Sequence, residues 1–281
     1  MKVKKRIVMV IDYTILMMLS GIIVVPLLWL LGNSLKSDKD IRVNMAKLLP
    51  SPGEWQIDNY IQAWKRGNIG QTIWNSLFNT LVSVVLILAV AYFTSYAIAR
   101  IRYRGSEFIH AMFVSMMMVP LAQVVMIPQF RIISGLNLVD THIGVILLYT
   151  AAGIPFSVFL LTSFLRKIPI ELDEAACIDG CSRLAIIFRI LLPLSKPGIA
   201  TVVIFQRMNV WNDYFTALIY LRSPEMKTIT LGLKNFMGQW GLVDYNRLFA
   251  AIAIVTFPII LLYVIFQNQF QSGLTSGSVK G

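Results

Sequence analysis

Long uninterrupted apolar runs constrain this chain more than any other feature of its sequence. A helix needs about 20 mostly apolar residues to cross the hydrocarbon core of a bilayer, because each residue adds about 1.5 Å of rise. Six runs are long enough, and none alternates with the period of a barrel strand. The sequence therefore predicts an all-α integral membrane protein. Its six predicted transmembrane helices lie at 7–31, 72–99, 108–130, 142–164, 197–221 and 248–270.

The composition fits a chain whose main solvent is lipid. Hydrophobic residues make up 57% of the sequence, charged residues make up only 14%, and the mean hydropathy is +0.69. These values are typical of membrane proteins. A net charge of +11 would suggest nucleic acid binding in a soluble protein, but here Lys and Arg lie between apolar runs and form no basic, aromatic-interleaved patch. We therefore expect no nucleic acid partner.

The short basic segments predict how the chain is oriented. Four basic residues lie within 2–6, before the first run, and three lie within 100–104, after the second. Lys and Arg in short connections mark the cytoplasmic side, whereas long connections such as 32–71 translocate largely regardless of charge. Both termini are therefore expected in the cytoplasm, together with the long connection 165–196.

The same pattern predicts the organisation of the chain. Residues 1–71 are expected to form an N-terminal transmembrane helix and a first extracytoplasmic loop. Residues 72–281 are expected to form a core membrane domain with five transmembrane helices, the cytoplasmic loop 165–196 and a C-terminal tail at 271–281. The connections 131–141 and 222–247 are expected outside.

The cytoplasmic loop carries helix signals of its own. Pro169 suits the first turn of a helix, and three acidic residues within 171–174 suit its positive N-terminal end. Gly180 suits the left-handed residue that ends a helix. The sequence thus predicts a helix of about three turns, followed by a second helix that ends near Pro193.

The first of these helices has a face of partly small apolar residues: Leu172, Ala175, Ala176 and Ile178. Small residues let a backbone approach another surface closely, so this face suits docking into a groove of another protein. A helix lying on the membrane surface explains the same pattern equally well.

A family resemblance favours docking. The segment Glu174-Ala-Ala, Gly180 and Ile190-Leu-Leu-Pro193 resembles the Glu-Ala-Ala signature of permease subunits of binding-protein-dependent ABC importers. Further stretches between 75 and 281 resemble the carbohydrate, maltose-type branch of that family. They include 118–120, 127–128, 135–136, 144–147, 154–156, 211–214, 230–233 and the ending 273–281. Cys177 departs from the family, where a basic residue is common.

The resemblance implies a type I ABC importer permease fold and a role for the cytoplasmic loop. In the family this loop forms a coupling helix that sits in a cleft of the ATP-binding subunit and carries its closure to the membrane helices. The coupling residues implied here are Glu174, Ala175, Ala176, Asp179, Gly180 and Pro193.

The resemblance also implies a multi-pass permease subunit of a bacterial cell membrane, inner or plasma, that imports a sugar or oligosaccharide by alternating access. Its implied partners are a second permease subunit, two ATP-binding subunits, an extracytoplasmic solute-binding protein and membrane lipid.

Neither an enzyme activity nor a cofactor is expected in this chain. The phosphate-binding pattern Gly-x-x-x-x-Gly-Lys-Ser/Thr does not occur in the sequence, so ATP and Mg²⁺ are expected to be used by partner subunits. Cys177 and Cys181 lie four residues apart and cannot complete a tetrahedral metal site by themselves.

Polar residues inside two apolar runs are candidates for the solute path. Gln206, Asn209 and Asp213 are spaced to share one face of the fifth run, and Gln123 lies in the third run. Polar groups at bilayer depth must face protein or water. They can line a hydrated path for hydroxyl-rich solutes, or they can bond to neighbouring helices and bend the span.

The connection 222–247 carries three aromatic residues, Phe236, Trp240 and Tyr245. Exposed aromatic side chains on a flexible outer loop suit contact with a solute-binding protein. An aromatic belt at the membrane interface is the alternative.

Three other functions compete with a sugar importer. The same machinery can carry another solute, such as a polyamine or phosphate. An ion-driven secondary transporter predicts paired intramembrane acids or inverted repeats, whereas only Asp213 lies deep in a run. A membrane enzyme needs clustered catalytic groups, but His110 and His142 lie on separate runs.

Overall fold

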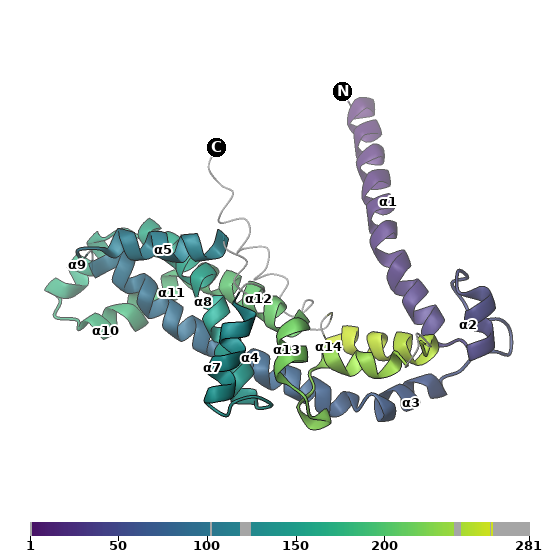
Figure 1. Cartoon of the computed structure of the whole chain (residues 1–281). Helices are drawn as coiled ribbons and strands as arrows, with labels where there is room; N and C mark the ends of the chain where they lie inside the picture. Colours follow the sequence, from purple (N-terminus) through teal and green to yellow (C-terminus); the bar gives the residue numbers. More distant parts are fainter. Residues whose placement is uncertain (1, 102, 119–124, 239–242, 259, 261–281) are drawn as a thin grey trace. The chain divides into compact units, whose positions relative to one another are not determined.

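The computed structural model describes residues 2–101, 103–118, 125–238, 243–258 and 260, with the side chains of 9 and of 11 onward (Figure 1). These residues form helices and turns. Their β-structure consists of two isolated bridges, Lys36 with Trp55 and Met237 with Val243. The described residues divide into two compact units: unit 1 comprises 2–70 and 232–260, and unit 2 comprises 71–231. Residues 232–260 therefore group with the N-terminal segment.

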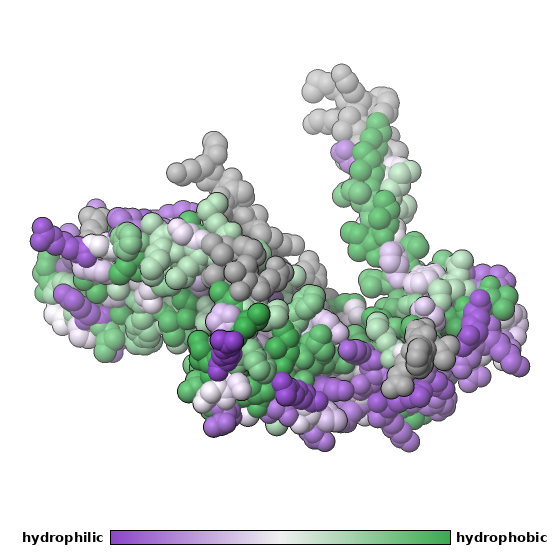
Figure 2. Space-filling view, in the orientation of Figure 1, coloured by the Kyte–Doolittle hydropathy of each residue, from purple (hydrophilic) through white to green (hydrophobic). Residues whose placement is uncertain are grey.

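Three helices among the described residues are long and apolar enough to cross a membrane. They are α1 (Lys2–Ser34), α4 (Ile69–Tyr96) with the π-helical turn η1 (Ala97–Ile101), and α8 (His142–Lys167). They correspond to the first, second and fourth predicted spans. The exposed surface of α1 is dominated by apolar residues (Figure 2), among them Met17, Ile22 and Ile23, as expected of a helix in lipid.

Two further predicted spans are described only in part. The span predicted at 108–130 contains α5 (Ser106–Met118) and α7 (Met126–Gly135), and residues 119–124 between them lie outside the described residues. The span predicted at 248–270 begins within a helix at 245–258, and its part from 261 onward is not described. The C-terminal tail 271–281 also lies outside the described residues.

The fifth predicted span is wrong as a single helix. The structure has α12 (Lys196–Asn212) and α13 (Phe215–Tyr220) in place of a continuous helix over 197–221. The chain is extended at Asp213, where ψ is 132°, and the Asp213 carboxylate accepts a hydrogen bond from the backbone N–H of Ala217 at 3.0 Å. A carboxylate that bonds to the free N–H groups of a new helix stabilises its start, so the polar residue divides the span.

In unit 1, the segment that follows α1 is folded around two buried charges. Lys36 donates hydrogen bonds to Asn33 Oδ1 (3.0 Å) and to the carbonyl oxygens of Asn44 (2.8 Å) and Lys47 (2.6 Å). Asp40 accepts from the backbone N–H and the hydroxyl of Ser51, at 2.9 and 2.8 Å. The predicted first loop thus has an ordered interior. Its helices are α2 (Asp38–Asn44) and α3 (Asp58–Arg66), and η4 (Leu233–Phe236) belongs to the same unit.

In unit 2, α4, α8 and α12 pack closely through small residues. A Cβ added to Gly153 of α8 would lie 2.5 Å from Ile87 Cδ1 of α4, and one added to Gly198 of α12 would lie 2.7 Å from Phe164 Cγ of α8. These distances are too short for any side chain, so glycine permits the helices to approach. The remaining helices of this unit are α9 (Glu171–Ile178), α10 (Arg183–Ile186), η2 (Ile187–Leu191), α11 (Leu192–Leu194), η3 (Pro224–Met226) and α14 (Ile229–Gly232).

Candidate functional site

The segment 165–196 forms a helix where its sequence predicts one, but the helix has 8 residues, about two turns instead of about three. Helix α9 runs from Glu171 to Ile178, with Glu171, Asp173 and Glu174 in its first turn. Ile170 is the N-cap and makes no side-chain cap hydrogen bond, so the acidic side chains are the groups that complement the positive helix end. Pro169 precedes the N-cap and does not lie in the first turn as predicted.

The C-terminal end of α9 is a Schellman motif. The N–H of Cys181 donates to the carbonyl of Ala176 at 2.9 Å, and the N–H of Gly180 donates to the carbonyl of Cys177 at 3.1 Å. Gly180 has φ +79°, a left-handed conformation that residues with a Cβ adopt at a cost. The prediction that Gly180 ends this helix is confirmed.

One side of helix α9 is buried against the rest of the chain, and the other side is exposed. Ala176 is buried and belongs to the core cluster that includes Leu165 and Ile186, whereas Ile178 is 86% exposed. The other predicted coupling residues have exposed side chains or, for glycine, an exposed backbone: Glu174, Ala175, Asp179, Gly180 and Pro193. Ala176 therefore anchors the helix, and the exposed residues are the ones that can contact another protein.

The second predicted helix of the loop is present in three short pieces. Helix α10, the π-helical turn η2 and α11 follow one another from Arg183 to Leu194, and Ser182 caps α10 through a hydrogen bond from the N–H of Ala185 at 3.3 Å. The chain then bends by 75° into α12. The predicted end near Pro193 is confirmed.

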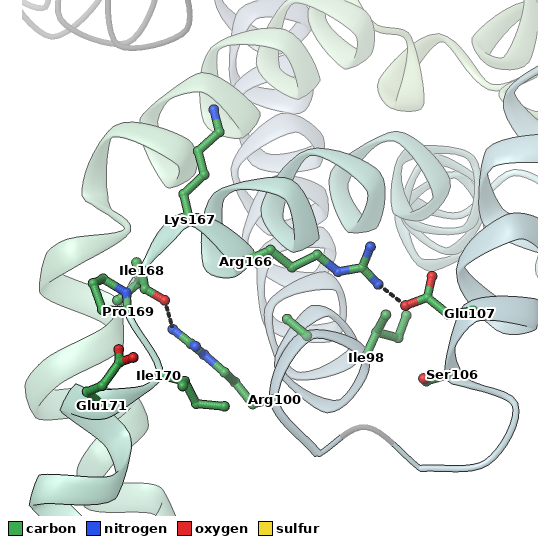
Figure 3. Close-up of a pocket in the computed structure, with 11 residues that line it drawn as sticks. Ile98, Arg100, Ser106, Glu107, Arg166, Lys167, Ile168, Pro169, Ile170 and Glu171 are labelled. Carbon is green, nitrogen blue, oxygen red and sulfur yellow. Dashed lines mark hydrogen bonds and ion pairs between the residues drawn. The ribbon is translucent and has the colours of Figure 1, made fainter.

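One residue that contacts α9 was not singled out as a site residue by sequence reasoning, which used Arg100 only as a marker of orientation. Arg100 lies in η1, and its Nη2 donates to the carbonyl oxygen of Ile168 at 2.9 Å (Figure 3). Its Nε lies 3.4 Å from Oδ2 of Asp173 in α9. The two charged side chains are only 6% and 14% exposed. An arginine at the end of an apolar run normally suggests a membrane-interface anchor, and nothing in the sequence pattern points to Asp173 as its partner.

The Asp173 side chain is mostly buried. Burial raises the pKa of the Asp173 carboxyl, and the positive charge of Arg100 opposes that shift. A buried carboxylate is costly unless it is paired, so Asp173 depends on Arg100 for its ionised form.

Two cavities flank the first turns of α9. One has a volume of about 780 Å³ and is lined by η1, the start of α5, the end of α8 and the segment 168–171. The other has a volume of about 410 Å³ and lies between α4, α9 and α10. Arg100 and Ile170 line both cavities and so form the partition between them. On the far side of the larger cavity, Arg166 pairs with Glu107 of α5 at 2.6 Å (Figure 3).

The structure does not gather the candidate path residues on one exposed face. Gln206 is buried, and its Nε2 donates to the carbonyl of Gly153 (3.0 Å) and to Ser157 Oγ (3.1 Å) on α8. Asp213 accepts a hydrogen bond from the hydroxyl of Tyr149 at 3.0 Å. Asn209 is exposed, and the candidate Gln123 lies outside the described residues.

The alternative interpretation, bonding to neighbouring helices, therefore describes Gln206 and Asp213. A role of these residues in a solute path stays a prediction.

The predicted exposure of Phe236 is wrong. Phe236 is 1% exposed, because its segment forms η4 and folds back: the N–H of Asp244 donates to the Phe236 carbonyl at 3.0 Å. A Cβ added to Gly67 would lie 2.9 Å from the Phe236 ring. Tyr245 is 42% exposed and stacks on Phe249. Trp240 lies outside the described residues.

The cysteines are free thiols in the structure. Cys177 is exposed on α9 and Cys181 is half-buried. Among the described residues, no cluster of three or more His, Cys, Asp or Glu side chains suits a metal ion.

Comparisons with known proteins match most of the chain. The model of a family described as binding-protein-dependent transport system inner membrane component matches residues 95–276, which include α9 and α12.

Two curated relatives match along nearly their whole length. The diacetylchitobiose uptake system permease protein NgcG of Streptomyces coelicolor is 30% identical, over 96% of this chain and 88% of the relative. The arabinooligosaccharides transport system permease protein AraQ of Bacillus subtilis is 35% identical, over 94% and 93%.

One solved structure contains a chain whose fold is similar to that of this protein. It is described as a crystal structure of a bacterial ABC transporter involved in the import of the acidic polysaccharide alginate. One of its chains superposes with a TM-score of 0.81 at 23% identity, covering 94% of this chain and 96% of that chain.

Proposed function

This chain belongs to the family of binding-protein-dependent transport system inner membrane components, and on that basis we propose that it forms half of the translocation path of an ATP-driven importer for a sugar or oligosaccharide. The observation that carries the solute class is the match, over nearly the whole chain, to relatives whose names give diacetylchitobiose and arabinooligosaccharides as their solutes. The chain is a transporter component of the inner membrane.

In this proposal α9 is the coupling helix. Its exposed side, which includes Glu174, Ala175 and Asp179, contacts a separate ATP-binding subunit, while Ala176 holds the helix to its own chain. The exposed apolar side chain of Ile178 supports this role, because a large apolar group at a helix end gains most when a partner covers it. ATP and Mg²⁺ are bound by the partner subunits.

The complete machine contains four kinds of chain. They are this permease, a second permease, two copies of an ATP-binding subunit, and an extracytoplasmic solute-binding protein that delivers the solute. Both termini and α9 face the cytoplasm of a bacterial cell, consistent with the basic residues within 2–6 and 100–104. ATP-driven closure of the ATP-binding subunits moves the coupling helices and exposes the path outward, and hydrolysis resets it inward.

The proposal is tested by reconstitution with the products of neighbouring genes. The permease is co-purified with its candidate partners, and ATP hydrolysis and solute uptake are measured with a panel of sugars, a polyamine and phosphate.

The informative variant is Gly180→Arg. It places a long side chain at the exposed end of α9, at a left-handed φ that residues with a Cβ adopt at a cost. Gly105→Arg is the matched control, because Gly105 also has a positive φ (+93°) and open space around it.

We expect the wild type and Gly105→Arg to retain an ATPase that is stimulated by sugar-loaded binding protein, and Gly180→Arg to lose it. A wild-type chain that purifies without an ATPase and moves solute on an ion gradient would be a secondary transporter. An ATPase stimulated only by a polyamine or phosphate would support an ATP-driven importer and contradict a sugar as its solute.

A further inference from the structure

Helix α9 is attached to the rest of unit 2 at few points. Ala176 enters the core cluster, and Asp173 meets Arg100 of η1. Most of the last turn is exposed, and so are the other three residues of the first turn, Glu171, Leu172 and Glu174. A force applied to the exposed side of α9 must therefore pass to the membrane helices through a small number of contacts.

The two cavities described above mark where α9 does not pack against its neighbouring helices. They lie on either side of Arg100, and Arg100 and Ile170 form the partition between them. Packed and paired groups transmit displacement. Helix α9 meets η1 through the Asp173–Arg100 pair and through Ala176, which shares a core cluster with Ile98 and Ala99.

The buried ion pair between Arg100 and Asp173 resists separation. The Arg100 guanidinium donates a hydrogen bond to the Ile168 carbonyl that precedes α9, and its Nε makes a charge contact without a hydrogen bond to the Asp173 carboxylate within the helix. Both side chains are largely buried, so separating the charges would leave each of them unpaired in a medium of low polarity, which is strongly unfavourable. A movement of α9 therefore carries η1 with it.

We propose that Arg100 is a positioning residue that transmits the movement of α9 to α4 through its buried ion pair with Asp173. This inference rests on the proposed function of α9 as the coupling helix. It adds a route by which the movement of that helix reaches the membrane: from Asp173 to Arg100, and from η1 into α4, which is one of the three continuous candidate spans.

The chain offers a matched control at the same cavity. Arg166 and Glu107 also form an ion pair, at 2.6 Å, but their side chains are 38% and 75% exposed. Exposed pairs are screened by water and hold their partners weakly. Glu107→Gln therefore removes a charge pair near α9 without removing a buried link.

The test uses the complete transporter reconstituted in liposomes, with ATP-binding subunits and sugar-loaded binding protein. Three quantities are measured for each variant: the ratio of subunits that co-purify, ATP hydrolysis, and solute taken up per ATP hydrolysed. The variants are Arg100→Gln, Asp173→Asn, the double variant, Arg100→Lys and Glu107→Gln.

We expect Arg100→Gln to keep the wild-type subunit ratio and to lose uptake per ATP by about tenfold or more, the scale of a typical coupling between two sites. Asp173→Asn should behave alike, and the double variant should be no worse than either single variant, because one interaction is removed in all three. Arg100→Lys should lose less coupling than Arg100→Gln, since it keeps the positive charge opposite Asp173 but not the hydrogen bond to the Ile168 carbonyl. Glu107→Gln should match the wild type.

Wild-type uptake per ATP in Arg100→Gln would overturn the inference and leave the proposed function intact. Equal loss of subunit assembly in Arg100→Gln, Asp173→Asn and Arg100→Lys would also overturn it, since the pair would then serve folding alone. If the wild type itself shows no ATP-dependent uptake, the proposed function fails instead, so the two failures are distinguishable.

Discussion

Asp40 shows how single residues hold the segment after α1. It is buried and accepts hydrogen bonds from Ser51 and from Asn44 Nδ2 at 2.8 Å. The backbone N–H of Ser51 is the main group that holds the pKa of the Asp40 carboxyl below its usual range, with the side chains of Asn44 and Ser51 and the charge of Lys36 adding to it. The ionised form therefore stabilises the fold.

A pH-dependent loss of stability is expected from this group. The stabilisation is fully present above the ordinary carboxyl pKa of about 3.9 and is lost as the pH falls through the lower folded value. Asp40→Asn should lower the free energy of unfolding by about 1–3 kcal/mol near neutral pH. Thermal unfolding in detergent should show this difference shrinking as the pH is lowered below 4 or so. A difference that is constant from pH 7 to pH 3 would contradict the assignment.

Gly153 tests the close approach of helices in unit 2. A Cβ at this position would lie 2.5 Å from Ile87 Cδ1 and 2.9 Å from Gln206 Oε1. Gly153→Ala should therefore destabilise the protein by about 1–3 kcal/mol, the usual cost of overpacking a core. Gly21→Ala in α1 is the control, since nothing lies within 4 Å of the added atom. Equal thermal stabilities of the two variants would refute the tight packing.

At the scale of elements, the break between α12 and α13 depends on Asp213. Its carboxylate accepts from the Ala217 N–H, from Thr216 Oγ1 at 3.0 Å and from the Tyr149 hydroxyl. Asp213→Ala leaves these donors without their acceptor and should cost about 1–3 kcal/mol of stability. Asn209→Ala, at an exposed position of the same helix, should leave the unfolding temperature unchanged. A stable Asp213→Ala variant would show that packing alone ends α12.

The same break marks the limit of prediction from sequence. Hydropathy located α1, α4 and α8, because a long apolar run has few other stable conformations in lipid. The left-handed φ of Gly180 was also predictable, since it follows from glycine's own chemistry. The hydrogen bond between Asp213 and Tyr149 and the burial of Phe236 were not, because both depend on partners far away in sequence, Tyr149 and the segment around Gly67. The pairing of Arg100 with Asp173 escaped for the same reason.

At the scale of the whole molecule, the two native thiols report on orientation. Cys177 is exposed on α9 and Cys181 is half-buried, so a membrane-impermeant maleimide should react with Cys177 in inverted vesicles and not in intact cells. Cys177→Ser should abolish the labelling, whereas Cys181→Ser should retain it. Labelling of Cys177 from outside intact cells would reverse the proposed topology. Co-expression of the ATP-binding subunit should slow the reaction, because the proposed docking on α9 covers Cys177.

The wide turn at Ala97–Ile101 makes the position of Arg100 sensitive to chain length. A π-helical turn holds more residues than an α-helical turn, and each residue of an α-helix corresponds to about 100° of rotation. Deleting Ala97 would let the backbone close into ordinary α-helix and would leave Arg100 pointing in nearly the same direction, because the wide turn holds the extra residue. Deleting a second residue of this turn as well would turn Arg100 by roughly 100° about the axis of α4. The guanidinium would then leave Asp173 although every charged residue is still present. The direction of the Arg100 side chain thus depends on the number of residues in the turn that contains it.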